Sequence, residues 1–465
     1  MFNCDPRYTR DPLCCPTLGQ GVSMTVTATA GSMSATQRKK EVRRVILSSY
    51  LGSTIEFYDF LLYATAASLV FGPVFFADLD PLAASIASMG TFAAGYVARP
   101  LGGIVFGHFG DTVGRKAMLL ISMTVMGIAS FAIGLIPPPE MIGSWAAVIL
   151  VLLRVCQGLA VGGEWGGAAL MSLEHAESGK RGFAAAFTNA GAPTGALLGT
   201  LALAAVSLLP DEQFLTWGWR IPFLISAFML ALGLFIRSKV SESPLFTAAL
   251  KESAKKETTP PIVTILKRPR AVVVASMSCI ASFGMQTAFT TFAITYAVSS
   301  GAPRSDALLA FSFCQFCAIF LVLGSARLSD RIGRRPVMLA GLGAMILSVY
   351  PLFLLLSTGQ FPFVALAFVG YTLCHSATYG PMAAFISEQF GTRARYTGAS
   401  LGYQLATLIG AGFTPVILAS LFASSGKSIL PVGLFIIALC VVSAVFLVAT
   451  KESKDNDLSA ETPSA

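Results

Sequence analysis

Charged residues are scarce in this chain of 465 residues. Asp, Glu, Lys and Arg together make up 12% of it, whereas hydrophobic residues make up 54%. A typical soluble domain has roughly 25% charged residues. The composition therefore does not fit a soluble globular domain and predicts a chain that lies largely within a lipid bilayer.

Motifs for covalent, metal or nucleotide chemistry are also lacking. The nine cysteines are scattered and predict neither a disulfide framework nor a metal site. Cys314 and Cys317 have a C-x-x-C spacing, but they lie in an apolar helix without a histidine or further cysteine nearby. The glycine-rich string GGEWGG around Glu164 lacks the preceding strand and the G-K-[ST] ending of a phosphate-binding loop. We therefore expect no enzyme and no cofactor.

The N-terminal 37 residues contain no apolar stretch as long as the core of a signal peptide. Small polar residues are frequent there, and Met24 and Met33 lie just before a basic run. We expect residues 1–37 to form a disordered tail, part of which precedes an alternative start at one of these methionines.

Long apolar segments recur along the rest of the chain. A helix needs about 20 such residues to cross the roughly 30 Å of hydrocarbon in a bilayer. The segments lack the alternation of apolar and polar residues that a membrane barrel requires, so we expect helices. The prediction is an all-α membrane protein with twelve transmembrane helices, at residues 45–76, 83–106, 117–136, 145–171, 183–208, 220–237, 271–299, 304–327, 336–356, 362–387, 394–422 and 430–449.

Basic residues are distributed unevenly between the two sides of this predicted bundle. Nearly all Lys and Arg outside the helices fall on the side of the N-terminus, and the other side carries Arg220, Arg304 and Lys427. Because basic loops stay in the cytoplasm, we expect a multi-pass protein of the cell (plasma or inner) membrane with both termini cytoplasmic. The formal net charge of +8 reflects this asymmetry, and no single basic patch predicts a nucleic-acid partner.

The longest polar interval between two apolar segments divides the chain into six predicted helices and six. Within it, an amphipathic helix at 244–256 is plausible, ended by Pro260 and Pro261. The expected domains are the tail 1–37, an N-terminal six-helix bundle 38–237, a cytoplasmic linker 238–270, a C-terminal six-helix bundle 271–450 and a cytoplasmic tail 451–465.

Two loop motifs recur in both halves. D-x-x-G-R-[KR] follows the second helix of each, in GHFGDTVGRK (107–116) and ARLSDRIGRR (326–335), and a Glu precedes an Arg by seven residues after each fourth helix. A carboxylate at such a place can cap the positive N-terminus of a neighbouring helix. We expect ion-pair clusters that hold the cytoplasmic side closed; the alternative is that the basic members only set the topology. The expected cytoplasmic gate consists of Asp111, Gly114, Arg115, Glu174, Arg181, Asp330, Arg334, Glu388 and Arg395.

Five charged residues lie inside the apolar segments, where each is unfavourable by several kcal/mol and therefore indicates a function. They are Glu56, Asp59, Arg99, Arg154 and Glu164. Three carboxylates against two guanidinium groups leave one carboxylate formally unpaired. Desolvation favours its neutral form, so a proton can bind there. We expect proton coupling through Asp59, Glu56, Arg154 and Glu164.

Glu56 and Asp59 lie one helical turn apart, and their mutual repulsion favours protonation of one of them. Asp59 lies farther from the cytoplasmic end and is the expected titrating group. Arg154 can bind either Asp59 or a substrate carboxylate through two parallel hydrogen bonds, and competition between the two would couple solute to proton. The alternative is a permanent structural pair of one carboxylate with Arg154 or Arg99. Arg99 precedes Pro100 and can instead support the cytoplasmic gate.

Polar side chains within the helices of both halves are candidates for binding a small hydrophilic solute. His375 can titrate near neutral pH, but a lone helix histidine is more often a packing residue. The expected substrate-binding residues are Arg154, Gln157, Tyr63, Asn189, Gln286, Tyr379 and Gln404.

Four stretches carry a resemblance to a known family: IEFYDFLLY, ARPLGGIVFGHFGDTVGRK, RVCQGLAVGGEWGGA and WGWRIPFLIS. With the repeated D-x-x-G-R-[KR] loop, the chain from about residue 40 to 450 resembles the metabolite:proton symporter family of the major facilitator superfamily. Ala326 departs from the glycine usual at its loop position. The resemblance implies the major facilitator fold, in which two pseudo-symmetric six-helix bundles rock around a midplane site.

An ion gradient must supply the energy, because the sequence has no ATP-binding motif. The resemblance implies proton-coupled symport of a small polar metabolite: an organic acid, which the two arginines favour, or a zwitterionic osmolyte such as proline or betaine. The expected partners are this solute, a proton and the lipid bilayer, and the expected state is a monomer. Two alternatives stay open, a proton-coupled exporter and a non-transporting solute sensor; Ala192–Pro193, in place of the exporters' G-P, disfavours the former.

Overall fold

The computed structural model describes residues 35–112, 115–174, 176, 179–238, 269–390 and 395–454, and all regular secondary structure in these ranges is helical. The described residues from 42 onward belong to one compact unit, to which the following description refers. The predicted amphipathic helix at 244–256, most of the linker and residues 1–34 of the predicted tail lie outside the described ranges.

Six long helical segments make up the N-terminal half. Two of the expected spans are continued or preceded by short helices near the loops, and the fourth is divided after Gly162. The helices are α1 (Ala35–Leu69), α2 (Phe71–Phe75), α3 (Pro81–Thr112), α4 (Arg115–Gly134), α5 (Pro139–Ile142), α6 (Trp145–Gly162), α7 (Trp165–Glu174), α8 (Arg181–Val206), α9 (Asp211–Gln213), η1 (Phe214–Gly218) and α10 (Arg220–Ser238).

The C-terminal half has the same number of long segments. The first and fifth of them contain a π-helical stretch, η2 and η3. The helices are α13 (Pro269–Thr287), η2 (Ala288–Phe292), α14 (Ala293–Ser299), α15 (Arg304–Ile332), α16 (Arg334–Leu356), α17 (Phe361–Glu388), α18 (Arg395–Thr407), η3 (Leu408–Gly412), α19 (Thr414–Ser424) and α20 (Leu430–Val448).

Each of the twelve expected transmembrane segments corresponds to one of these helices or runs of helices. Within the described residues, ten are long and apolar enough to cross a bilayer, and Leu120–Gly134 is a shorter apolar helix. The first helix begins at Ala35, before the predicted end of the tail at residue 37. Its first residues, ATQRKKE, are good helix formers, which explains the earlier start.

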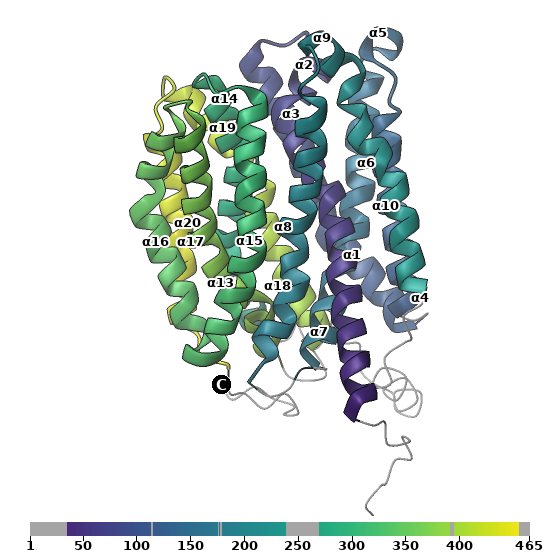
Figure 1. Cartoon of the computed structure of the whole chain (residues 1–465), viewed down its shortest axis with the longest axis vertical. Coiled ribbons are helices and arrows are strands. Elements are labelled where there is room, and N and C mark those ends of the chain that lie inside the picture. The colour runs from purple at the N-terminus through teal and green to yellow at the C-terminus, as the bar shows by residue number, and fades with distance from the viewer. Residues whose placement is uncertain are drawn as a thin grey trace, which may run out of the picture. The chain divides into compact units, whose positions relative to one another are not determined.

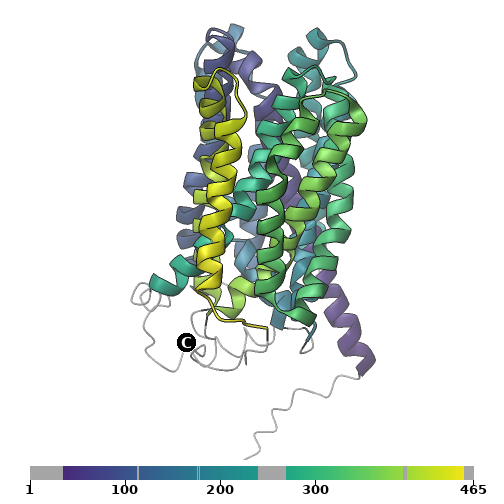
Figure 2. The same ribbon diagram turned by 90° about the vertical axis from the view of Figure 1, so that its left-hand side faces the viewer.

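The two halves lie side by side with their helices roughly parallel, the N-terminal half purple to teal and the C-terminal half green to yellow in Figure 1. Figure 2 shows the same parallel arrangement from the side of the C-terminal half. Across the interface, α8 contacts α15 and α17, and α3 contacts α18, η3 and α19. The interior between the halves is therefore lined by helices of both.

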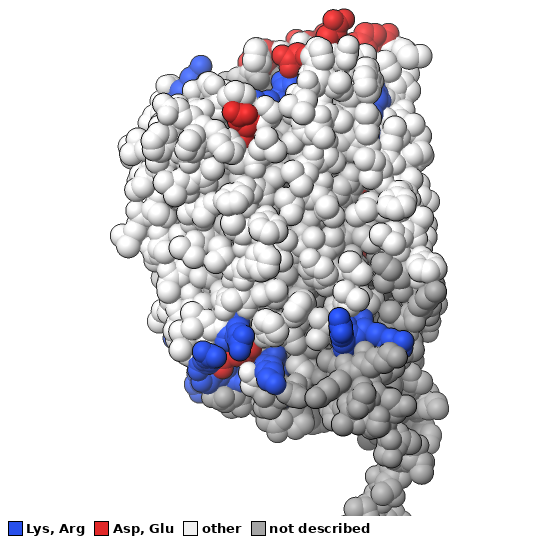
Figure 3. Space-filling model, viewed as in Figure 1, with Lys and Arg blue, Asp and Glu red and all other residues white. Residues whose placement is uncertain are grey.

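Charge is concentrated at the two ends of the bundle, as Figure 3 shows for one face. We call them the basic end, with Arg43, Arg44, Lys180, Arg181, Arg327, Arg331, Arg335, Lys451 and Lys454, and the acidic end, with Asp78, Asp80, Glu140, Asp211, Glu212 and Asp306. The halves are bonded at both ends. Asp330 accepts backbone hydrogen bonds from the start of α8 at the basic end, and Arg304 pairs with Asp211 at 3.0 Å at the acidic end.

Candidate functional site

Asp59 lies in the C-terminal part of α1 and is 1% exposed. Its carboxylate accepts a hydrogen bond from the Ser226 hydroxyl of α10. Among the described residues, no Lys or Arg forms an ion pair with it. The Ser226 hydroxyl therefore stabilises a buried carboxylate that has no counter-ion in the described part of the chain.

Arg154 of α6 is fully buried. Its Nη1 donates to Oε1 of Gln157 at 2.9 Å, while Nε and Nη2 have no hydrogen-bond partner. The rings of Phe60, Tyr63 and Phe92 surround its Cζ, at centroid distances of 3.9, 4.1 and 4.7 Å. Cation–π contacts of this kind stabilise a desolvated guanidinium by about 2 kcal/mol, but they leave its N–H groups unsatisfied. The N–H groups of Nε and Nη2 thus remain available to a ligand.

A second guanidinium lies at the same aromatic ring. The Cζ of Arg99 is 4.0 Å from the centroid of Phe60 and 4.6 Å from that of Tyr96, and its Nε has no hydrogen-bond partner. The sequence offered two roles for Arg99, a structural pair with a carboxylate or support of the cytoplasmic gate. The structure places its side chain beside Arg154 in the interior. Two positive charges around one ring make this region favourable for an anion.

The expected direct contact between Asp59 and Arg154 is not present. Arg154 is turned toward the aromatic rings of α1 and α3, whereas Asp59 accepts from Ser226 of α10. Gln157 accepts from Arg154 with its Oε1, and its Nε2 donates to Oγ of Ser130 at 2.7 Å. The hydrogen bonds of Arg154 therefore lead to Ser130, and none of them reaches Asp59 in the described structure.

Glu56 and Asp59 also have separate surroundings, although they lie one turn apart on α1. Glu56 is 3% exposed and interacts electrostatically with Tyr379 and Tyr403 of the C-terminal half. The hydroxyl that binds the Asp59 carboxylate comes from α10 instead. Glu56 thus faces the interface between the halves, and Asp59 faces the interior of its own half.

Glycines allow α3 and α6 to approach closely enough to hold Arg154 in this position. A Cβ on Gly95 would lie 2.6 Å from Nε of Arg154, and a Cβ on Gly158 would lie 2.0 Å from the carbonyl oxygen of Gly95. A Cβ on Gly162 would lie 2.1 Å from the carbonyl oxygen of Arg99. Any larger residue at these positions would force the helices apart and displace both arginines.

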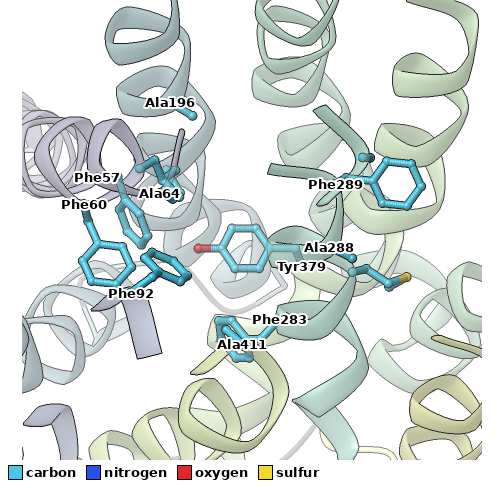
Figure 4. Close-up of a cluster of buried hydrophobic side chains, with 14 of the residues drawn as sticks. Phe57, Phe60, Ala64, Phe92, Ala196, Phe283, Ala288, Phe289, Tyr379 and Ala411 are labelled. Atoms are coloured by element: carbon cyan, nitrogen blue, oxygen red, sulfur yellow. The ribbon is translucent and has the colours of Figure 1, made fainter. Parts of the chain in front are cut away.

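Several expected substrate-binding residues lie at the interface between the halves. Asn189 of α8 donates from Nδ2 to the carbonyl oxygen of Tyr379 at 2.7 Å, and Gln404 of α18 donates from Nε2 to that of Gly162 at 3.0 Å. The Tyr379 hydroxyl and Oδ1 of Asn189 are buried without a hydrogen-bond partner. In Figure 4 the hydroxyl of Tyr379 points across the interface toward Phe57, Phe60 and Phe92.

Tyr63 and Gln286, the other expected binding residues of this group, are buried as well, and so is His375. The Tyr63 hydroxyl donates to Thr91 Oγ1 at 2.7 Å, although its ring contacts Arg154. Gln286 is buried in α13. His375 stacks between the rings of Tyr371 and Tyr379, at 5.4 and 5.1 Å, and its Nε2 has no hydrogen-bond partner.

Glu164 and Trp165 lie where α6 ends and α7 begins, and both are buried. The Trp165 ring stacks on that of Tyr403 with centroids 3.8 Å apart and an interplanar angle of 16°. Stacking of this kind joins the two halves through a broad flat contact. No sequence signal indicated that Trp165 and Tyr403 stack on each other, because the two residues lie in different halves of the chain.

At the basic end, the charged residues of the C-terminal half form a closed cluster around Arg334. Its Nη1 pairs with Asp330 at 2.6 Å, and its Nη2 pairs with Glu388 at 3.2 Å. Asp330 also accepts from the backbone N–H groups of Gly182 and Phe183 at 2.9 Å each, at the N-terminus of α8. The carboxylate of one half thus caps a helix of the other.

The C-terminal segment after α20 completes this cluster. The sequence motifs did not predict these contacts. Glu452 accepts from the backbone N–H groups of Arg334 at 2.8 Å and Arg335 at 3.0 Å, and so caps α16. The Ser453 hydroxyl donates to Glu388 at 2.6 Å. The sequence offered one signal, a Glu in the polar stretch KESK directly after the last apolar helix.

The corresponding cluster of the N-terminal half falls largely outside the described part of the chain. Gly114 is not described, nor are the side chains of Asp111, Arg115 and Glu174. The side chain of Arg395, which was expected in the cluster of the C-terminal half, is not described either. Arg181 is described and lies at the first position of α8, next to the backbone that Asp330 caps.

Comparison with known proteins identifies the family. A model of the Major Facilitator Superfamily matches residues 49–411. The chain belongs to this superfamily. Its members are transporters, so the protein is a multi-pass membrane transporter and not an enzyme, as the sequence predicted.

Relatives within the Major Facilitator Superfamily match almost the whole chain. An inner membrane metabolite transport protein of Escherichia coli, YhjE, is 39% identical over 425 residues, which are 89% of this chain and 95% of the relative. The shikimate transporter of Escherichia coli is 37% identical over 416 residues, again 89% and 95%. The proline/betaine transporter of Salmonella typhimurium is 29% identical over 441 residues, 91% and 86%.

A solved member of the superfamily has the same fold. The proton:xylose symporter XylE, bound to 6-bromo-6-deoxy-D-glucose, superposes with a TM-score of 0.71 at 18% identity, over 91% of this chain and 98% of that one. The predicted arrangement of two six-helix bundles in the major facilitator fold is thereby confirmed.

Proposed function

We propose that this transporter carries a small organic anion together with a proton, by alternating access between the two halves. The observation that carries the proposal is Arg154, a fully buried guanidinium in which two nitrogens, Nε and Nη2, have no hydrogen-bond partner among the described residues. A buried charge without a counter-ion is unfavourable by several kcal/mol, and a bound carboxylate would remove this penalty.

The geometry of Arg154 favours a carboxylate over other polar groups. A guanidinium presents its N–H groups in a planar fork that matches the two oxygens of a carboxylate. Arg99, at the same ring of Phe60, adds a second positive charge. The unpartnered Tyr379 hydroxyl, across the interface, offers a polar contact from the other half. A small solute that touches both halves would close them around itself.

Asp59 is the proposed proton site. It is buried and has a hydroxyl partner but no basic residue as an ion-pair partner among the described residues, so that a proton can neutralise it without breaking an ion pair. Glu56 and Glu164 are proposed to take part in proton coupling from the interface side, because both are buried close to where the halves meet.

The cluster around Arg334 is proposed as a gate at the basic end. Asp330 bonds to α8 of the other half, so this end cannot open until those two hydrogen bonds break. The basic residues at this end support a cytoplasmic location for it and for both termini. We further propose residence in the cell membrane as a monomer.

A zwitterionic osmolyte is the second candidate solute. The proline/betaine transporters among the relatives favour it, and its carboxylate would bind Arg154 in the same way. The rings of Phe60, Tyr63 and Phe92 are already occupied by Arg154, which leaves them less available for a quaternary ammonium group. This arrangement favours the anion.

Uptake by reconstituted protein tests the proposal. Proteoliposomes are given labelled shikimate, succinate, proline or betaine, with the outside more acidic than the inside or at equal pH. We expect accumulation of an acid only with the proton gradient, and its loss when a protonophore is added. Uptake that does not depend on the gradient would contradict symport. Binding without uptake would indicate a sensor. Movement of the solute only from the inside of the vesicles to the acidic outside would indicate an exporter.

The residue assignment is tested in the same vesicles. In Asp59→Asn the charge no longer changes with pH, so we expect solute exchange without accumulation. A variant that still accumulates the acid to the wild-type level would remove Asp59 from the mechanism.

A further inference from the structure

Buried polar atoms without a hydrogen-bond partner are concentrated on a few helices. Among the described residues they belong to side chains of α3, α6, α7, α8 and α17, namely Arg99, Arg154, Trp165, Asn189, His375, Ser376 and Tyr379. About 90% or more of buried polar groups in proteins are hydrogen-bonded, so such a concentration requires an explanation. The carboxylate proposed for Arg154 accounts for the guanidinium groups but not for the neutral side chains.

Asn189 of α8 has a side-chain orientation that its one hydrogen bond determines. A backbone carbonyl oxygen only accepts, so the bond of 2.7 Å to the carbonyl oxygen of Tyr379 must come from Nδ2. The other polar atom of the amide, Oδ1, is buried and has no partner in the described structure. An amide oxygen only accepts hydrogen bonds, so a ligand can satisfy it only with an O–H or N–H group.

The hydroxyl of Tyr379 is a second unpartnered neutral group at this interface. The ring of His375 stacks on the Tyr379 ring with centroids 5.1 Å apart, and the ring of Phe283 meets it edge-on at 6.3 Å. In Figure 4 the hydroxyl points across the interface toward Phe60 and Phe92. A phenol can donate and accept, and the Tyr379 hydroxyl does neither within the described residues.

The ring of Phe60 relates these neutral groups to the two guanidinium groups. The Cζ atoms of Arg154 and Arg99 lie 3.9 and 4.0 Å from its centroid. The Tyr379 hydroxyl points toward the same ring from the other half of the molecule. The carboxylate-binding groups and the neutral groups are therefore directed to one region of the interface.

An ammonium group could also donate to Oδ1 of Asn189, but it is disfavoured here. Arg99 and Arg154 are both buried, and they repel a further positive charge in surroundings of low permittivity. An ionised Glu56 would offset only one of these two charges. A quaternary ammonium group has no N–H to donate. A hydroxyl group carries no charge, and it can donate to Asn189 and accept from Tyr379.

We propose that the solute is a hydroxylated carboxylate, with a hydroxyl group bound by Asn189 and Tyr379 while its carboxylate is bound by Arg154. The proposal rests on the proposed function and specifies the class of organic anion. A site that bonds a solute hydroxyl discriminates against the analogue without it, because that analogue leaves buried polar atoms of the protein unpartnered. Asn189 and Tyr379 are thus specificity-determining residues.

Matched pairs of acids test the proposal. Shikimate is compared with cyclohexene carboxylate, which has the same kind of ring and carboxylate without hydroxyl groups, and malate is compared with succinate. Dissociation constants are measured by isothermal titration calorimetry with the purified protein in detergent. We expect a hydroxylated acid to bind at least about tenfold more tightly than its deoxy partner. Equal affinities within both pairs, or tighter binding of the deoxy acids, would overturn the proposal.

Tyr379→Phe removes the hydroxyl and keeps the ring. The dissociation constant of the preferred hydroxylated acid should rise about tenfold, while that of its deoxy partner stays within about twofold. Tyr371→Phe is the matched control on the same helix, because the Tyr371 ring stacks on Phe289 at 4.2 Å and its hydroxyl is not among the unpartnered atoms. This variant should keep the preference for the hydroxylated acid. An unchanged preference in Tyr379→Phe would contradict the proposal.

Asn189→Leu gives a second, independent test. Leucine has a similar size but no acceptor, so binding of the hydroxylated acid should again weaken about tenfold. The substitution also removes the hydrogen bond to the carbonyl oxygen of Tyr379, and thermal unfolding is therefore measured beside binding. Binding of the deoxy acid with its wild-type dissociation constant shows that the variant is folded. An unchanged affinity for the hydroxylated acid would count against the proposal.

Arg154→Leu separates this proposal from the proposed function. It should weaken binding of both members of a pair to the same extent, because each has the carboxylate. If acids accumulate with a proton gradient but hydroxylated and deoxy acids bind equally, the hydroxyl site is wrong and the symport proposal stands. If none of these acids binds or accumulates, the proposed function fails and the hydroxyl site fails with it.

Discussion

The two clusters of buried charge in this protein are built in opposite ways. At the basic end, Arg334 is paired directly with Asp330 and Glu388, and the remaining acceptors of these carboxylates bind Ser453 and the backbone of α8. In the interior, Arg154 has no carboxylate partner among the described residues, and two of its N–H groups are unsatisfied. Both arginines are almost completely buried.

The difference indicates what each cluster is for. A buried ion pair with all its hydrogen bonds made holds elements together and is strongly destabilised when one partner is removed. A buried charge without a partner lowers stability, and it persists where a ligand or proton supplies the missing interaction. Removal of Arg334 should therefore mainly affect stability, and removal of Arg154 mainly transport.

Arg334→Ala should have the largest effect. It leaves Glu388 and Asp330 without their guanidinium partner, and we expect a loss of about 3–5 kcal/mol of stability. Thermal unfolding in detergent measures it. The adjacent Arg335 is the control, because the hydrogen bonds of its side chain in the described structure go to backbone carbonyls of α20, at 3.1 and 2.8 Å, and Arg335→Ala should cost about 1 kcal/mol. Equal losses of stability in Arg334→Ala and Arg335→Ala would show that the ion pairs of Arg334 contribute no more than the hydrogen bonds of Arg335.

Arg154→Leu should affect transport strongly and stability little, the reverse of Arg334→Ala. We expect uptake to fall on the order of 100-fold, equivalent to about 2.7 kcal/mol, while thermal stability stays the same or rises because an uncompensated charge is removed. Arg154→Lys keeps the charge but loses the planar fork, so its uptake should lie between that of the wild type and that of Arg154→Leu. A variant that transports normally, or one that unfolds as readily as Arg334→Ala, would contradict the comparison.

Glu452→Gln tests how much the C-terminal segment stabilises the cluster at the basic end. The neutral amide can cap α16 less well than the carboxylate, and we expect a loss of about 1 kcal/mol. The exposed Glu212 at the acidic end gives the control, since Glu212→Gln should change thermal stability by less than about 0.5 kcal/mol. No difference between the two variants would mean that the C-terminal segment adds nothing to the cluster.

Asp211→Asn should have the smallest effect, although it also breaks an ion pair between the halves. Arg304 and Asp211 are 24% and 82% exposed, so water and salt screen their attraction. We expect a change of less than about 0.5 kcal/mol that disappears as salt is added. A loss comparable to that of Arg334→Ala would show that burial is not what distinguishes the clusters.

The sequence indicated the contacts of the cluster around Arg334 but not those of Asp59 and Arg154. Asp330, Arg334 and Glu388 stand in a repeated loop motif, and the structure places them in contact. Asp59 and Arg154 stand out as charges in apolar helices, but their different partners, Ser226 for Asp59 and Gln157 for Arg154, could not be inferred. Serine is common in membrane helices, and its partner depends on how neighbouring helices are rotated against each other.

Local features of the sequence were enough to predict the membrane location, the helices with most of their bounds to within a few residues, the division into two halves and the charged residues of interest. These follow from local properties: apolar length, turn residues and the high free energy of a charge in lipid. Which charges are paired depends on the tertiary structure. It turned Arg154 toward aromatic rings and away from Asp59, and it brought Glu452 to the start of α16, because contacts between distant segments depend on helix packing and not on sequence spacing.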